Sequence, residues 1–199
     1  MPEAGVGTVL LAAGRGTRFG PAPKLLAALA GKPLVRHAAE AALAARARPV
    51  IVVLGAHADA VRAALRGLDL VLVENPDYAA GLSTSLRVGL AALPEAVTGA
   101  LVLLGDMPRV TAAHLDRLIA AFAAADPLPA AIVPVHAGRR GNPVLLNRTR
   151  LAPDLARLAG DRGAGPLLAG RTDVLEIPGD EGTALDIDTP AALADLGGA

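Results

Sequence analysis

Short, uninterrupted apolar runs alternate along the chain with segments of helical periodicity. The runs lie at residues 8–11, 50–54, 70–73, 100–104 and 131–133. Between them, apolar side chains recur at the three- and four-residue spacing of an amphipathic helix in residues 34–45, 58–65 and 111–125. Continuous apolar runs are typical of strands that are buried on both faces. We therefore predict a three-layer α/β fold, a mostly parallel open sheet flanked by helices, in a single domain of residues 1–199.

The last third of the chain is less regular. It contains a turn-rich stretch at residues 137–143, an apolar stretch at residues 144–146 and a closing helix that begins at Pro190 and is capped by Thr189. In an open α/β sheet, ligands bind beyond the carboxyl ends of the strands. The loops that follow Leu11 and Leu104 are therefore where we expect the chemistry.

Composition narrows the choice of partners. Lysine and arginine together number 19, as do aspartate and glutamate, and the aromatic residues are one tyrosine and two phenylalanines. Such a chain has neither the charge nor the stacking groups that favour nucleic acid or an anionic membrane. Cysteine is absent, which excludes disulfides and thiolate ligands. No apolar run approaches the ~20 residues of a membrane span. We expect a cytoplasmic protein that binds no nucleic acid and no membrane.

A glycine-rich loop follows the first apolar run. Residues 11–20 read L-A-A-G-R-G-T-R-F-G, and residues 23–26 read P-K-L-L. Glycines let backbone N–H groups approach phosphate oxygens, and Arg18 and Lys24 supply matching cations. A dinucleotide motif from Gly14 would need glycine where Phe19 stands, and the Gly-Lys-Ser/Thr of a P-loop is absent. The loop therefore predicts a phosphate site of another kind, and the alternative is a plain turn with solvated cations.

Two later loops carry carboxylates. Asp106 follows the apolar run at residues 100–104 after a single glycine, and Asp186 and Asp188 precede the closing helix. A carboxylate at a strand end beside the glycine loop can hold Mg²⁺ against a triphosphate. Asp186 and Asp188 share a face if their segment is extended, so both stay candidates. The alternative for Asp188 is a helix cap alone.

In this order, the motifs resemble the signature of the MobA-like nucleotidyltransferases, which implies a Rossmann-like nucleotidyltransferase fold. The resemblance runs from residue 11 to residue 192 and is strongest to the branch that transfers a nucleotide to molybdopterin. Residues 75–90 resemble that branch's N-x-x-x-x-x-G-x-S-x-S-L-x-x-G-L, residues 138–144 its G-x-x-G-x-P-V and residues 158–165 its L-x-G-D-x-G-A-R.

The resemblance implies roles residue by residue. Arg18, Lys24 and Asp106 would be catalytic, and Asp106 and Asp188 would hold Mg²⁺ or Mn²⁺. The nucleotide would be bound by Leu11, Ala12, Ala13, Gly14, Gly16, Thr17, Arg18, Lys24, Gly81, Ser83, Ser85 and Asp106. The acceptor would be bound by Arg140, Asn142, Pro143 and Asp161.

The chain departs from the family pattern at two positions on the acceptor side. Asn142 stands where histidine is usual, and Gly165 stands where arginine is usual. Arg139, Arg140 and Arg162 either supply the missing cation or are solvated loop charges.

The implied reaction transfers CMP from CTP to molybdopterin with release of pyrophosphate, and a molybdenum hydroxylase would receive the product. A phosphate nucleophile is already ionised at neutral pH, so catalysis needs alignment and charge neutralisation rather than a base. By resemblance, Ala13 is typical of CTP-using members, whereas the guanine-using branch more often has glycine there. The alternatives are a GTP-dependent guanylyltransferase, a sugar-1-phosphate nucleotidyltransferase, a non-catalytic nucleotide- or cofactor-binding chaperone for a molybdoenzyme, and a Rossmann dehydrogenase.

Overall fold

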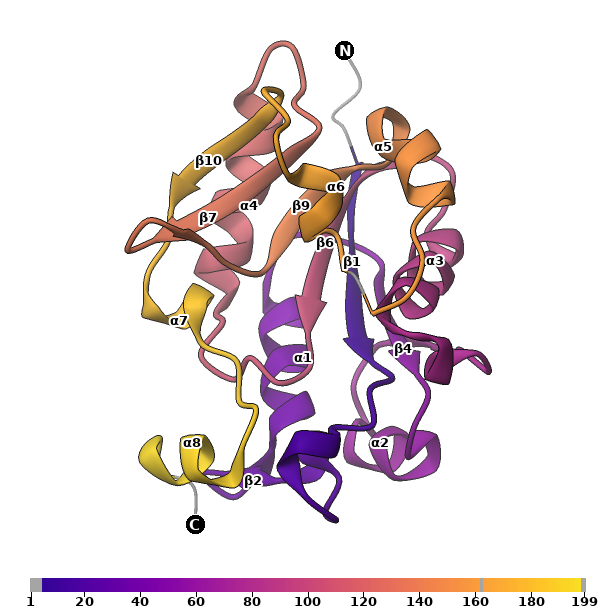
Figure 1. The fold of residues 1–199 in the computed structure, drawn as a ribbon, viewed down its shortest axis with the longest axis vertical. Coiled ribbons are helices and arrows are strands. Elements are labelled where there is room, and N and C mark those ends of the chain that lie inside the picture. Colours follow the sequence, from indigo (N-terminus) through magenta and orange to yellow (C-terminus); the bar gives the residue numbers. More distant parts are fainter. Residues whose placement is uncertain (1–4, 162, 198–199) are drawn as a thin grey trace.

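The computed structural model describes residues 5–161 and 163–197, which form a mixed, mostly parallel sheet flanked by helices (Figure 1). The sheet has eight strands in the order β10-β7-β9-β6-β1-β4-β5, with β8 paired to β7. They are β1 (Gly5–Ala12), β4 (Val50–Leu54), β5 (Val71–Glu74), β6 (Val97–Leu104), β7 (Ala131–His136), β8 (Arg139–Arg140), β9 (Val144–Asn147) and β10 (Val174–Pro178). A separate two-stranded hairpin joins β2 (Ala28–Leu29) to β3 (Lys32–Pro33).

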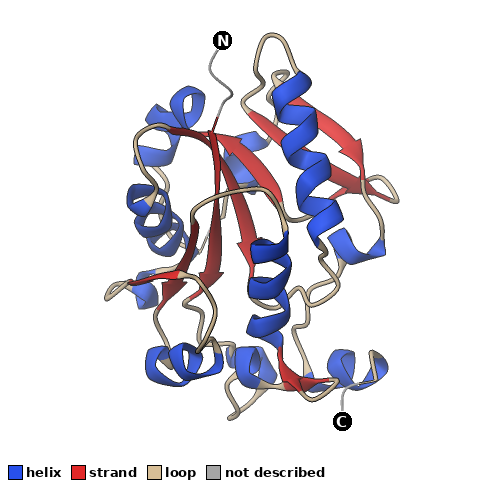
Figure 2. Ribbon diagram, turned by 180° about the vertical axis from the view of Figure 1, so that it is seen from behind, coloured by secondary structure: helices blue, strands red, loops and turns tan. Residues whose placement is uncertain are grey.

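The helices lie on both faces of the sheet (Figure 2). They are α1 (Leu34–Ala44), α2 (Ala58–Ala64), α3 (Leu82–Ala92), α4 (Ala112–Ala124), α5 (Arg148–Ala156), α6 (Gly165–Leu168), α7 (Glu181–Ala184) and α8 (Pro190–Asp195). Short 3-10 turns lie at η1 (Thr17–Phe19), η2 (Lys24–Leu26) and η3 (Tyr78–Ala80). In the described part of the chain no helix is long and apolar enough to cross a membrane.

Burial on both faces explains the continuous apolar runs. Along β1, Leu10 packs with α1, α2 and α4 on one face, whereas Val9 and Leu11 pack with α3 and α5 on the other. Val9 and Leu10 are both 0% exposed. Neighbouring residues of a strand point to opposite faces of the sheet. Because helices cover both faces, successive residues of a central strand are mostly apolar rather than alternately apolar and polar. The predicted three-layer α/β fold is confirmed.

The central strands are parallel, and β9 and the short β8 run in the opposite direction to the others. β1 runs parallel to both β4 and β6, and β4 runs parallel to β5. β9 is antiparallel to both β6 and β7, and β10 is parallel to β7. The carboxyl ends of β1 and β6 therefore meet at the same edge, which is the lower edge in Figure 1.

Two contacts bring distant segments to that edge. The Gly105 N–H donates to the Leu11 carbonyl oxygen at 3.1 Å and joins the ends of β6 and β1. A small apolar cluster of Phe19, Leu34, Ile187 and Leu193 packs the glycine-rich loop against the C-terminal segment. The edge of the sheet is thereby enclosed by residues from both ends of the chain.

Candidate active site

A cleft of about 500 Å³ opens beyond the carboxyl ends of β1 and β6. Among the residues singled out in the sequence, it is lined by Leu11, Ala13, Gly14, Gly16, Thr17, Arg18, Lys24, Ser85, Asp106, Asp161, Asp186 and Asp188. The structure therefore gathers the glycine loop and the aspartate loops around one space. These loops are far apart in the sequence: Lys24 and Asp188, which form a hydrogen bond in the cleft, are 164 residues apart.

The glycine loop turns sharply at Gly16, whose backbone has φ of +63°. This left-handed conformation strains any residue that has a Cβ. A Cβ at Gly16 would also lie 2.8 Å from the Cβ of Lys24. Glycine is therefore required at this position for the loop to fold back onto η2 and place Lys24 beside it.

Lys24 is the centre of the charged network in the cleft. Its Nζ donates to Asp106 Oδ2 at 2.6 Å and to Asp188 Oδ1 at 2.9 Å, and its side chain is 13% exposed. Arg18 pairs with the other oxygen of Asp188 at 2.8 Å from a solvent-exposed position. Burial opposes the charge on Lys24, but attraction to Asp106 and hydrogen bonds to both aspartates raise the pKa of Lys24 above its ordinary value.

Three carboxylates surround this ammonium group. Oxygens of Asp106, Asp186 and Asp188 lie within 4.8 Å of one another, a spacing that lets them share a metal ion. A hydrogen bond from Ile187 N–H to the Asp106 carbonyl oxygen, at 3.0 Å, holds the two segments together. Sequence reasoning left Asp186 open, and the structure places it with the other two.

The donor set suits a hard divalent cation. Asp106 Oδ1 is buried and has no hydrogen-bond partner among the described residues, which leaves one carboxylate oxygen free to act as a ligand. Burial, and then the negative charges of Asp106 and Asp188, raise the pKa of Asp186 above its usual range. A cation among these oxygens would offset the repulsion between the carboxylates, and a donor set of oxygens alone fits Mg²⁺ or Mn²⁺.

The start of α3 forms one wall of the cleft, and its hydroxyl groups are largely used internally. The side-chain amide of Asn75 donates to Thr84 Oγ1 at 2.8 Å and to Ser85 Oγ at 3.0 Å. Ser85 lines the cleft, whereas Ser83 is 0% exposed and is not among the residues that line it. That either serine binds nucleotide stays a prediction, and the geometry favours Ser85.

Two further residues expected to bind nucleotide do not line the cleft. Ala12 is buried inside β1, because the strand extends through it. At Gly81, with φ of +114°, a Cβ would lie 2.4 Å from the carbonyl carbon of Gly160. Gly81 is needed where the start of α3 crosses the loop that leads to Asp161.

The cleft also contains a cation–aromatic pair that sequence reasoning missed. The Arg15 guanidinium lies 5.6 Å from the centroid of the Tyr78 ring, and both residues line the cleft. The available signal was that Tyr78 is the single tyrosine of the chain and lies in the loop before α3. A charged group over the face of an aromatic ring is stabilised by the ring's electrons, so the pair helps to hold Arg15 at the cleft.

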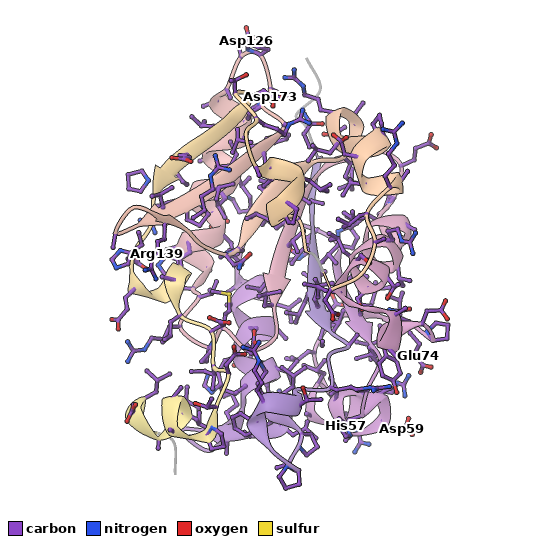
Figure 3. All side chains as sticks on the ribbon, viewed as in Figure 1. His57, Asp59, Glu74, Asp126, Arg139 and Asp173 are labelled. Carbon is purple, nitrogen blue, oxygen red and sulfur yellow. The ribbon has the colours of Figure 1, made fainter. Side chains whose placement is uncertain are left out.

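A second cavity of about 510 Å³ adjoins the first, and Asp186 lines both. The second cavity is also lined by His136, Arg139, Arg140 and Asn142. Figure 3 shows Arg139, the first residue of β8, on the side of the molecule opposite Glu74, His57 and Asp59. The acceptor residues predicted from the sequence are thus divided between two spaces, because Asp161 lines the first cavity and Asn142 the second.

The other acceptor candidates are more constrained than expected. Arg140 Nε donates to Glu176 at 2.7 Å and its Nη1 donates to the Leu168 carbonyl oxygen at 2.8 Å, so its charge is already paired. Pro143 is buried. Arg162 lies outside the described residues. Of the two described arginines considered for the missing cation, Arg139 is the one that forms no ion pair with another described residue.

A hydrogen-bonded pair holds the segment that leads to Asp186 and Asp188. His114 Nδ1 accepts from the Thr111 N–H at 3.2 Å, so its Nε2 carries the proton that is donated to Asp180 Oδ2 at 2.7 Å. Burial opposes the charge on Asp180, but the bond from His114 and that residue's electrostatic attraction hold the pKa of Asp180 below its ordinary value. The Asn142 N–H donates to the Thr183 carbonyl oxygen at 2.9 Å and ties the same segment to the second cavity.

The fold and this cleft, with clustered cations and carboxylates beyond parallel strands, define a nucleotide-handling α/β protein. Residues 8–175 match the model of the MobA-like NTP transferase domain. The chain therefore belongs to the MobA-like family of nucleotidyltransferases, as its motifs predicted.

The curated proteins that resemble this chain in sequence are named for different activities. The chain is 32% identical to nicotine blue oxidoreductase of Paenarthrobacter nicotinovorans over 186 residues, which cover 91% of each protein. It is 42% identical over 126 residues to the bifunctional protein GlmU of Kineococcus radiotolerans. That match covers 62% of this chain and 26% of the relative, so the chain spans only about a quarter of the GlmU protein.

Among solved structures, Rv0371c of Mycobacterium tuberculosis superposes with a TM-score of 0.82 at 36% identity and 98% coverage of both chains. A structure of the same protein in complex with manganese superposes with a TM-score of 0.78 at 36% identity, covering 96% of this chain and 97% of that one. The similarity covers essentially the whole chain, so the complete fold, and not only the glycine loop, is shared.

Proposed function

We propose that this protein transfers CMP from CTP to molybdopterin and releases pyrophosphate, with Mg²⁺ or Mn²⁺ as cofactor. The observation that carries the proposal is the cluster of Arg18, Lys24 and three carboxylates in one cleft beside the glycine loop. Nucleotidyl transfer needs such a set, because charge on the reacting phosphates must be neutralised while the two substrates are aligned. The manganese complex of Rv0371c supports the choice of cofactor.

Each charged group has a place in this reaction. The glycine loop binds phosphate oxygens through its N–H groups, and Arg18 and Lys24 offset the charge of the triphosphate and of departing pyrophosphate. Asp106 and Asp188, with Asp186 beside them, would hold the divalent cation. When bound, that cation supplies Lewis-acid stabilisation of the phosphates. The acceptor phosphate is already ionised, so no residue has to act as a base.

The choice of CTP and of molybdopterin rests on fewer residues. Ala13 lines the cleft and is the residue that, by family resemblance, favours CTP over GTP. The second cavity, next to Asp186, offers a large acceptor a place from which its phosphate reaches the first cavity. We assign this arrangement to one nucleotidyltransferase domain of residues 1–199 that acts in the cytoplasm and supplies a molybdenum hydroxylase.

Pyrophosphate release tests the proposal directly. Purified protein is incubated with Mg²⁺ and molybdenum-loaded molybdopterin. The rate of pyrophosphate release is then compared among CTP, GTP, ATP and UTP, each supplied at the same concentration. We expect a strong preference for CTP. A preference for GTP would keep the reaction class and overturn the role of Ala13, whereas release only with sugar 1-phosphates would overturn the acceptor. Nucleotide binding without any release would favour the chaperone.

The relative named nicotine blue oxidoreductase, which matches the chain over 91% of its length, supports one second candidate, an oxidoreductase. Absorbance at 340 nm with NADH or NADPH and a quinone-like dye separates the two. We expect no oxidation above that of a heat-inactivated sample. Turnover of reduced nicotinamide without pyrophosphate release would replace the transferase proposal.

A further inference from the structure

We propose that the Lys24 ammonium group is an internal counterion that takes the place of the divalent cation in the free protein and has to leave before the cation binds. The inference rests on the metal role proposed above for Asp106, Asp186 and Asp188. It adds an order of events: the Lys24 ammonium group first occupies the carboxylates, and a bound nucleotide then draws it away from them.

The distances place the amine and the cation in competition. Lys24 Nζ lies 2.6 Å from one oxygen of Asp106 and 2.9 Å from one oxygen of Asp188. Both carboxylates belong to the set whose oxygens lie within 4.8 Å of one another. A divalent cation with oxygen ligands at about 2.0–2.6 Å from these carboxylates would lie beside the ammonium group, and the two positive charges would repel each other. Metal binding to the free protein therefore breaks two charge-assisted hydrogen bonds.

The position of the lysine backbone indicates where the ammonium group goes. Lys24 begins η2, and its Cβ packs against Gly16, where a further Cβ would lie only 2.8 Å away. The base of the side chain is thus fixed beside the glycine loop, while its four-carbon stem can turn. A triphosphate on that loop attracts the ammonium group and frees the carboxylates. Nucleotide and metal then bind cooperatively, and by linkage each strengthens the other to the same degree.

Mn²⁺ binding to the free, full-length protein tests this inference. Binding is measured by electron paramagnetic resonance and calorimetry, without nucleotide, for the wild type, Lys24→Met and Lys24→Gln. We expect Lys24→Met to bind Mn²⁺ at least about tenfold more tightly than the wild type, because no charged hydrogen bonds have to be broken. Lys32→Met is the matched control, since it removes an ion pair to Glu40 of 2.6 Å outside the cleft. Its affinity for Mn²⁺ should equal that of the wild type.

Thermal unfolding is used to check that each variant is folded. If Lys24→Met does not fold, the Mn²⁺ affinity of Lys24→Gln is compared with that of the wild type instead. Unchanged or weaker Mn²⁺ binding in a folded Lys24 variant overturns the inference. If the wild type still releases pyrophosphate in that case, the proposed function stands and only the competition is wrong. If neither the wild type nor the variants bind Mn²⁺, the metal role of the aspartates fails and the inference fails with it.

Discussion

The two ends of the joined cavities hold their cations in different ways. At the phosphate end, the nearly buried Lys24 is bonded to two carboxylates before any ligand arrives. At the far end, Arg139 is exposed at the start of β8, and Arg140 is paired with Glu176. A charged group held close to the reacting phosphates can stabilise the charge that develops on them, whereas a large incoming partner needs an open surface. In the proposed function, the first end would therefore carry out the chemistry and the second would recognise the acceptor.

The largest effect is expected for Asp106→Asn, which changes the end of the cleft where the phosphates would react. The substitution keeps the shape of the side chain and an oxygen that accepts from Lys24, but removes the charge that would hold the metal. We expect pyrophosphate release to fall by about a hundredfold or more, as when a charge-stabilising group is removed. The thermal midpoint should change little. Near-normal release in Asp106→Asn would show that the metal assignment is wrong.

A paired substitution at the acceptor end should separate two neighbouring arginines. Arg139→Ala is expected to raise the acceptor KM about tenfold with the CTP KM and kcat unchanged, because it removes a binding charge and no reacting group. Arg140→Ala should instead lower stability by about 1 kcal/mol through its lost bonds to Glu176 and Leu168. Steady-state kinetics and urea unfolding check both variants. An effect of Arg139→Ala on the CTP KM would erase the division between the two ends.

The smallest effect concerns the His114–Asp180 pair, which holds the segment between the two ends. The pKa of Asp180 is lowered in the folded protein, so its contribution to stability is present above the ordinary aspartate pKa and is lost as the pH falls below it. Because Asp180 is half exposed, we expect Asp180→Asn to cost only about 0.5 kcal/mol at pH 7. Urea unfolding at pH 7 and at a series of pH values down to about 2 checks this, and the difference from wild type should shrink as the pH falls through the lowered pKa of Asp180. A difference that stays constant over that range would have a cause other than the charge.

Much of the central sheet could be predicted from the sequence. The run at residues 50–54 coincides with β4, and the helix predicted at residues 34–45 differs from α1 by one residue. Thr111 and Thr189 cap α4 and α8 through their side chains, Thr189 as expected. These features depend on local periodicity and capping, which a single sequence records directly. The short elements from α5 to α7 and the strand β10 were not anticipated, because β10 is only half-buried and carries a glutamate and a proline.

The candidate site was less predictable than the fold. Glycines and aspartates at strand ends marked the loops, but not the bonds between them. Lys24 meets Asp106 across 82 residues and Asp188 across 164 residues, and no local pattern encodes such pairings. Nor does a pattern show that the hydroxyls of Thr84 and Ser85 are occupied by Asn75. Long-range packing decides which polar side chains remain available to a ligand.

The bond between Lys24 and Asp188 also has a consequence for synthesis and folding. During translation, the glycine loop leaves the ribosome long before the aspartate that completes the charged cluster. Contacts of such sequence separation form late, since a long loop of chain has to be closed first. An emerging chain can therefore assemble the β1–β4 core without a competent metal site. The charged cluster is complete only once the C-terminal segment has been made and Ile187 packs in the same apolar cluster as Phe19 and Leu34.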